Sequence, residues 1–289
     1  MVQKIMRRTL FLSLFFQCLF LLKSEAQLYV GPVLGGSLSK VYFFDSQFRF
    51  KSLPSLGFDA GIMASFKVQK NFRLNAELLF ARRTKNIVGT SGPGVDSQFS
   101  LTANMDFIEL PIFYALEFKN VSGGQFADGG KQKVYNWYVG AGPVVSYWLS
   151  NKGRLKSSNL LETNIDHVDY KGAFGSDDQS APSNVEIMPS VNRLQFGLNI
   201  TGGLAFEPVA GRKIMTSLQL YLMQTFLGES DGKFPGSTPL QKNQDDSDVL
   251  KARNYSLRFS VAYLFDTKVE KRKKGQSTIP TRDVRRKKR

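Results

Sequence analysis

Residues 56–68 read LGFDAGIMASFKV, and every second residue from Leu56 to Val68 is apolar, while glycine, aspartate, methionine, serine and lysine lie between them. Successive side chains of a β-strand point to opposite faces, so this stretch predicts a strand with one wholly apolar face. The same alternation recurs in residues 72–80, 108–118, 194–206 and 255–265. The sequence therefore predicts an all-β protein built from half-buried strands.

The first 26 residues have the features of a secretory signal peptide. Lys4, Arg7 and Arg8 precede an apolar run at residues 9–22, and Ser24-Glu25-Ala26 offers small residues before a cut between Ala26 and Gln27. This run is too short to span a bilayer as a helix. The single cysteine, Cys18, lies inside it, so we expect no disulfides in the mature chain.

Alternating strands behind a signal peptide predict a transmembrane β-barrel in the outer membrane of a Gram-negative bacterium, over residues 27–266. Short connections (residues 69–71 and 208–212) alternate with long polar ones (84–106, 150–192 and 227–252). Short turns are periplasmic in such barrels, and an even strand count places both termini in the periplasm. We expect eight antiparallel, up-and-down strands, at residues 28–42, 55–68, 72–83, 107–118, 134–149, 193–207, 213–226 and 253–265.

A soluble β-sandwich or a lipocalin-like barrel also uses alternating strands. Aromatic residues favour the membrane, because they lie at both ends of the apolar faces, as in the girdles of outer-membrane barrels. One group is Phe66, Phe72, Phe118, Trp137, Phe206 and Phe265, and the other is Phe58, Phe80, Tyr147, Phe196 and Tyr255.

The opposite faces of the strands carry charged residues of both signs, among them Asp59, Glu77, Glu109 and Arg258. Side chains fill the interior of an eight-stranded barrel. Buried charges must pair there, so we expect these four residues to form a polar network, with Glu77 or Glu109 close to Arg258. A proton or ion path along the same residues is the alternative.

Three prolines fall inside expected strands, Pro32, Pro111 and Pro143, and each predicts a β-bulge because proline lacks the N–H that the ladder needs. Residues 107–114, FIELPIFY, resemble the YLEIPLLLK signature of the PorT-like outer-membrane barrels of Bacteroidetes. The Gly-Pro strands, Phe196-Gly197-Leu198 with Gly202-Gly203, and the final Tyr263-Leu264-Phe265 are also similar to that family.

This resemblance covers residues 27–265 and implies the barrel fold and a link to type IX protein secretion. Most barrels of the family have no assigned function, so it implies the fold more strongly than the role. Ala115 stands where the family usually has a lysine or arginine, and residues 150–192 and the basic tail look like additions.

The formal net charge of +15 is concentrated near the C-terminus. Residues 267–289 hold eleven lysines and arginines against two acidic residues, whereas the predicted barrel carries only +3. We expect a disordered periplasmic tail that binds an anionic envelope partner, and no nucleic acid. The candidate contact residues are Lys271, Arg272, Lys273, Lys274, Arg285, Arg286, Lys287, Lys288 and Arg289.

Residues for catalysis are scarce, since the only histidine, His167, lies in the longest loop between Asp166 and Asp169. The sequence predicts no metal site, no cofactor and no enzymatic activity. We expect an accessory or scaffold component of an envelope machine, type IX secretion first. The partners would be outer-membrane lipid and other envelope proteins. The alternatives are a surface barrel whose loops bind external proteins or matrix, and a hydrolase built on His167.

Overall fold

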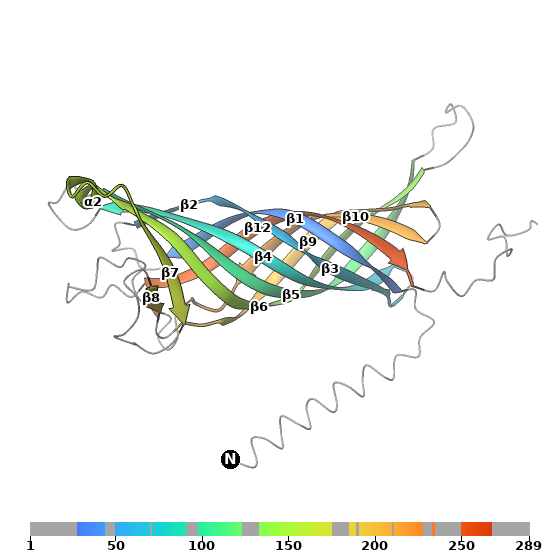
Figure 1. Cartoon of the computed structure of the whole chain (residues 1–289). Helices are drawn as coiled ribbons and strands as arrows, with labels where there is room; N and C mark the ends of the chain where they lie inside the picture. Colours follow the sequence, from blue (N-terminus) through green and yellow to red (C-terminus); the bar gives the residue numbers. More distant parts are fainter. Residues whose placement is uncertain are drawn as a thin grey trace, which may run out of the picture.

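A computed structural model of the chain describes residues 28–43, 50–69, 71–90, 98–122, 133–174, 185–188, 191–209, 211–227, 233–234 and 250–267. The predicted signal peptide, the Ala26–Gln27 cleavage site and the basic tail from residue 268 lie outside these ranges. The described part is a closed antiparallel barrel with a sheet that extends beyond one end (Figure 1).

Eight strands form the barrel wall, and all eight expected strands are confirmed. Each pairs antiparallel with the next in the chain, and the last pairs with the first, so the ring has no open edge. The strands are β1 (Leu28–Phe43), β3 (Ser55–Lys67), β4 (Phe72–Thr90), β5 (Gln98–Ser122), β6 (Lys133–Ser157), β9 (Leu194–Val209), β10 (Arg212–Met223) and β12 (Leu250–Asp266).

The two ends of the barrel differ in their connections. At the turn end lie the starting residues of β1, the last residues of β12 and the short β3–β4 and β9–β10 turns, and Tyr29 pairs there with Asp266. At the loop end lie the longer connections and the smaller elements. These are β2 (Phe50–Leu53), α2 (Ser158–Glu162), β7 (Val168–Phe174), β8 (Val185–Met188) and β11 (Lys233–Phe234).

The apolar faces of the strands point outward. Leu34, Ile62 and Phe259 are 65%, 56% and 56% exposed, although each lies in the middle of a paired strand. In water, such a band around the barrel would be a large exposed apolar surface, whereas in a bilayer it faces hydrocarbon. The protein is therefore a transmembrane β-barrel. No helix within the described ranges has the length and hydropathy needed to cross a bilayer.

The expected aromatic side chains lie on this outer surface near both ends of the apolar band. At the turn end, Phe118 and Trp137 pair across β5 and β6, and their rings stack with centroids 4.1 Å apart. At the loop end, Phe58 and Phe80 lie on β3 and β4 with ring centroids 6.2 Å apart. From Trp137 to Tyr147 on β6 is ten residues. At about 3.4 Å per residue and a tilt of about 40°, this corresponds to roughly 25 Å across the membrane.

At the loop end three strands are longer than expected, because residues 84–90 of β4, 98–106 of β5 and 150–157 of β6 continue as paired strands. With β7 they form what we term the sheet extension (Figure 1). One face of it buries Ile87, Leu101, Ala103, Leu155 and Tyr170 as a second apolar cluster. Parts of the loops expected at residues 84–106 and 150–192 are therefore paired strands.

The expected bulges at Pro32, Pro111 and Pro143 are wrong. The ladder pairs interrupted beside each proline resume in the same register, so no extra residue is inserted. Register shifts occur instead between Asp106 and Phe107, where β5 pairs with β6, and between Arg212 and Ile214, where β10 pairs with β9. The first lies where the barrel wall passes into the sheet extension, so it redirects the strands there.

Two adjacent glycines on β9 differ in what surrounds them. A Cβ atom on Gly203 would lie 2.0 Å from the Thr216 carbonyl oxygen of β10, whereas one on Gly202 would find nothing closer than the Tyr138 carbonyl oxygen at 3.7 Å. The lack of a side chain at Gly203 therefore lets β9 and β10 approach closely where the narrow barrel curves.

We expect Gly203→Ala to destabilise the folded barrel by about 1–3 kcal/mol, because the added methyl group overlaps a neighbouring strand. Gly202→Ala is the matched control and should leave stability nearly unchanged. The measurement is the temperature at which the compact, heat-modifiable form disappears on a detergent gel. Equal midpoints for the two variants would contradict this account of Gly203.

Candidate functional site

The inward faces of the strands meet in a buried ion-pair network near the middle of the barrel. It contains all four residues that the sequence analysis places in the lumen, Asp59, Glu77, Glu109 and Arg258. Each of the four is at most 2% exposed. We term these residues, together with Arg83, the lumen network.

Of the two partners expected for Arg258, Glu77 and Glu109, the structure pairs it with Glu77. The Arg258 Nη1 atom donates to Glu77 Oε2 at 2.5 Å and to Gln219 Oε1 at 3.0 Å. Gln219 Nε2 in turn donates to the other oxygen of Glu77 at 3.1 Å, and Tyr221 donates its hydroxyl to Gln219 Oε1 at 2.7 Å. Strands β4, β10 and β12 are thereby tied together across the lumen.

Arg83 organises the other half of the network. Its two terminal nitrogens donate to Asp59 Oδ1 and Glu109 Oε2, each at 2.7 Å, and one also donates to Ser37 Oγ at 2.6 Å. The second oxygen of Asp59 lies 3.5 Å from Arg258 Nε. Asp59 therefore bridges the two arginines, and the three carboxylates and two guanidinium groups balance to within one charge.

The sequence analysis did not include Arg83 in the network. Arg83 is an even number of residues from Arg73 and Glu77 on β4, so all three side chains point to the same, inward face. The expected strand ends at Arg83, whereas β4 continues to Thr90.

A second charged cluster lies near the turn end of the lumen. Glu117 Oε1 lies 2.8 Å from Arg73 Nε and 2.5 Å from Lys213 Nζ. The Arg73 guanidinium group also lies 5.3 Å from the centre of the Tyr29 ring, whose hydroxyl donates to Glu207 at 3.2 Å. This cluster uses the same principle as the lumen network, with every charge next to an opposite one.

Apolar layers separate and close these charged clusters. On β5, Phe113 and Ala115 lie between Glu109 and Glu117. They belong to a buried cluster to which all eight wall strands contribute. At the loop end, Phe107, Trp148 and Leu227 belong to another buried cluster. Side chains therefore fill the described lumen on both sides of the lumen network.

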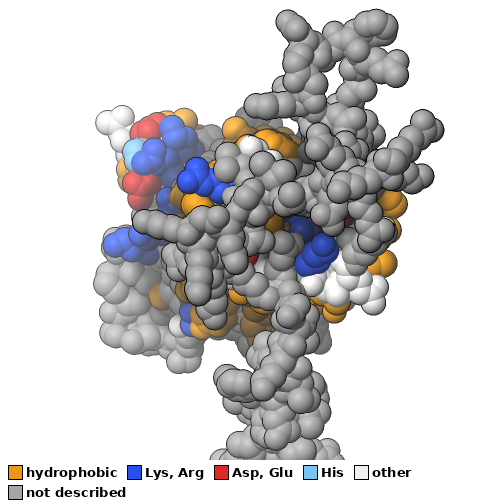
Figure 2. Space-filling model, turned by 90° about the vertical axis from the view of Figure 1, so that its right-hand side faces the viewer, with side chains coloured by type: hydrophobic (Ala, Val, Ile, Leu, Met, Phe, Trp, Pro, Cys, Tyr) orange, Lys and Arg blue, Asp and Glu red, His pale blue; other side chains and the backbone are white. Residues whose placement is uncertain are grey.

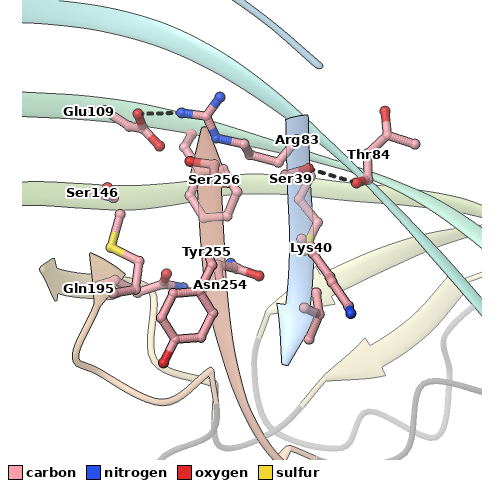
Figure 3. Close-up of a pocket in the computed structure, with 14 residues that line it drawn as sticks. Ser39, Lys40, Arg83, Thr84, Glu109, Ser146, Gln195, Asn254, Tyr255 and Ser256 are labelled. Carbon is pink, nitrogen blue, oxygen red and sulfur yellow. Dashed lines mark hydrogen bonds and ion pairs between the residues drawn. The ribbon is translucent and has the colours of Figure 1, made fainter. Parts of the chain in front are cut away.

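A small pocket remains between the lumen network and the apolar layer at the loop end. Arg83 and Glu109 face it from β4 and β5, with Ser39, Ser146, Gln195 and Ser256 around it (Figure 3). Ser39 donates its hydroxyl to the Thr84 carbonyl oxygen at 2.9 Å, so part of this lining is already engaged. Apolar side chains, among them Met105 and Phe107, complete the lining, so the pocket is a recess where polar groups meet the apolar layer.

His167 lies outside the barrel, directly before β7 of the sheet extension. Its Nδ1 atom lies 2.8 Å from Asp166 Oδ2, and its Nε2 atom lies 3.8 Å from Asp169 Oδ2. A hydrogen bond with His167 lowers the pKa of the Asp166 carboxyl group, and one from Arg154 lowers that of Asp169. Both imidazole nitrogens face carboxylates, and these carboxylates also pair with Arg154 and Lys156. The histidine therefore belongs to a cluster of charged side chains on the surface. Within the described residues, no group of three or more potential ligands is arranged to hold a metal ion.

No protein-family model matches the chain. No curated protein matches it in sequence either. Among solved structures it is similar to Neisserial surface protein A (12% identity, 81% of this chain and 95% of that chain covered, TM-score 0.32). It is also similar to Ail, the attachment invasion locus protein of Yersinia pestis (10%, 83% and 99%, 0.30), and to the outer membrane protein OprG from Pseudomonas aeruginosa (8%, 83% and 95%, 0.42).

These likenesses are remote, and the fold assignment depends on the closed ring of strands and its apolar outer surface. The chain is an eight-stranded β-barrel of the outer-membrane type.

We expect Arg258→Met to lower the stability of the barrel by about 3 kcal/mol, because it leaves Glu77 as a buried charge without its cation. The double variant Glu77→Gln/Arg258→Met should recover part of this loss. Arg154→Met is the control, since the Arg154–Asp169 pair is more than half exposed and should matter by less than about 1 kcal/mol. The measurement is the heat-modification midpoint, and an unchanged midpoint for Arg258→Met would show that the pair is dispensable.

Proposed function

We propose that the protein is a non-enzymatic scaffold of the outer membrane, an accessory component of an envelope machine. The observation that carries this proposal is the filled lumen. Ion pairs and apolar layers occupy the described interior, which suits a rigid frame better than a wide pore. Contacts with other molecules then fall to the outer wall and the two ends of the barrel.

Type IX protein secretion is the machine that we favour, and this choice depends on the resemblance of residues 107–114 and the associated motifs to the PorT-like barrels. In cells that lack the chain, secreted cargo of that system should accumulate in the periplasm, and the full-length chain should restore its export. Co-purification from mild detergent should bring other envelope proteins with the barrel. Normal export without the chain would contradict the secretion role.

Binding of external proteins or matrix is the second candidate function. The sheet extension favours it, because ordered strands there carry exposed polar side chains well beyond the barrel wall. Whole cells would then bind the external partner, and removal of residues 84–105 and 151–174 would abolish binding without affecting cargo export.

For topology, we predict that the loop end is extracellular and that both termini are periplasmic, since short turns of such barrels face the periplasm. An epitope tag within residues 175–184 should be labelled on intact cells, and a tag after Arg289 should be labelled only once the outer membrane is permeabilised. Labelling of the C-terminal tag on intact cells would reverse the assignment.

For the tail, we predict that deletion of residues 268–289 leaves the barrel folded and inserted but abolishes salt-sensitive co-purification with a periplasmic partner. Each cation near an anionic surface contributes about 1 kcal/mol, an attraction that salt screens. A tail of equal length with glutamine in place of every lysine and arginine separates charge from length. If the truncated protein still co-purifies with every partner, the tail does not bind the periplasmic partner.

A further inference from the structure

The outward face of the sheet extension is cationic, and it continues the lipid-facing surface of the barrel. On β4 the outward residues pass from Leu78 and Phe80 to Arg82 and Thr84, and on β6 they pass from Tyr147 to Lys152. The change from apolar to charged side chains comes directly after the aromatic residues of the loop end. Arg82, the first of these charged residues on β4, therefore lies near the level of the lipid headgroups, and Lys152 on β6 lies farther out.

Five cations face outward here, and three have a carboxylate partner. Arg82 pairs with Asp106 at 2.7 Å, Arg154 with Asp169 at 2.8 Å and Lys156 with Asp166 at 3.5 Å. Figure 2 shows Lys and Arg side chains gathered beside acidic ones and the single histidine at one edge of the molecule. The two cations that remain are Lys152 and Lys171.

Lys152 and Lys171 lie directly opposite each other in the β6–β7 ladder, and both are exposed. Within the described residues, neither ammonium group lies within 4 Å of a carboxylate, although Asp106, which pairs with Arg82, also attracts Lys152 from a greater distance. Like charges directly opposite on neighbouring strands are destabilising, so on its own this pair weakens the contact between β6 and β7, although β7 also pairs with β8 on its other side. An anion between the two ammonium groups would reverse the sign of that interaction.

The position of the pair indicates which anion is available. Lys152 is five residues beyond Tyr147, which at about 3.4 Å per residue and a tilt of about 40° places its backbone roughly 13 Å outside the aromatic level. Lysine side chains can extend along the surface toward the headgroups. Phosphate groups of membrane lipid are therefore within reach of both ammonium groups.

We propose that Lys152 and Lys171 together bind a phosphate group of the phosphorylated glycolipid in the outer leaflet, and that this contact fastens β7 to the barrel. The proposal takes the orientation given above, with the loop end extracellular. Arg154, two residues from Lys152 on the same face, adds a third positive charge beside the site. The ligand is a lipid headgroup held at the membrane surface, outside the lumen.

The test is hydrogen exchange of the backbone amides of β7 in the full-length protein, folded into symmetric phosphatidylcholine vesicles with or without lipid A. Because the lipid is present in both leaflets, the result does not depend on the proposed orientation. Lipid A should slow exchange in the wild type by up to about fivefold, since a cross-strand pair contributes up to about 1 kcal/mol.

Lys171→Gln should have effects of opposite sign in the two vesicles. Without lipid A it removes the repulsion, so β7 should exchange more slowly than in the wild type. With lipid A it removes a ligand of the phosphate, so lipid A should produce no further slowing. A Lys171→Gln variant that responds to lipid A as the wild type does would overturn the proposal.

The matched control is the double variant Lys40→Gln/Lys51→Gln, which removes two exposed cations of the loop end that lie away from β6 and β7. It should keep the full response of β7, as should Lys152→Arg/Lys171→Arg. Lipid A without its phosphates should have no effect. If the control loses the response, or if inorganic phosphate alone reproduces it, the headgroup site is excluded in favour of general charge attraction or a soluble anion.

Discussion

Closure of the sheet with only eight strands is the constraint on which the rest of the structure depends. Such a ring encloses a space that side chains fill, so the charged groups on the inward faces must find opposite charges in the barrel itself. Asp59 meets this demand by bridging Arg83 and Arg258, and Glu77 and Glu109 each take one of the two guanidinium groups. The same closure requires close approach of neighbouring strands, which is why glycine is found at Gly203.

The bilayer imposes the complementary constraint on the outside. Main-chain groups in hydrocarbon must pair within the protein, and a closed ring of antiparallel strands satisfies them all. The two-residue period then separates side chains by their surroundings, so Ile62 faces lipid while the adjacent Met63 is buried in the lumen. Fold and membrane insertion thus follow from one periodic pattern.

The sequence was sufficient to predict the strands and a carboxylate partner for Arg258 in the lumen, because both depend on the alternation of side chains along a strand. The aromatic residues at the ends of the apolar faces then indicated that these faces point outward. The sequence was not sufficient for features that depend on how strands meet in space. Residues 98–106 and 150–157 are polar on one face and lack the aromatic ends of the membrane-spanning strands, a pattern that predicts loops. In the structure they are strands, because Leu101 and Leu155 pack together with Tyr170. The missed role of Arg83 has the same origin, since it lies where the wall continues into the sheet extension. At the three prolines the ladder loses pairs, but no extra residue is inserted and the register is the same on both sides. The missing N–H of proline is therefore accommodated without a bulge.

The filled lumen and the sheet extension together bear on where this barrel meets other molecules. A lumen closed by Phe107 and Trp148 on one side and by Phe113 on the other leaves little that a solute could use, so selection for contact would act on the ends and the outer wall. The sheet extension is asymmetric, since it grows from β4, β5 and β6 on one side of the ring. A phosphate held by Lys152 and Lys171 would fix the outer edge of this sheet against the membrane surface, while Ile87 and Leu155 fix its inner face by apolar packing. Lipid would then act as a structural element of the extracellular surface, and any protein partner would meet a sheet whose position is already set by the membrane.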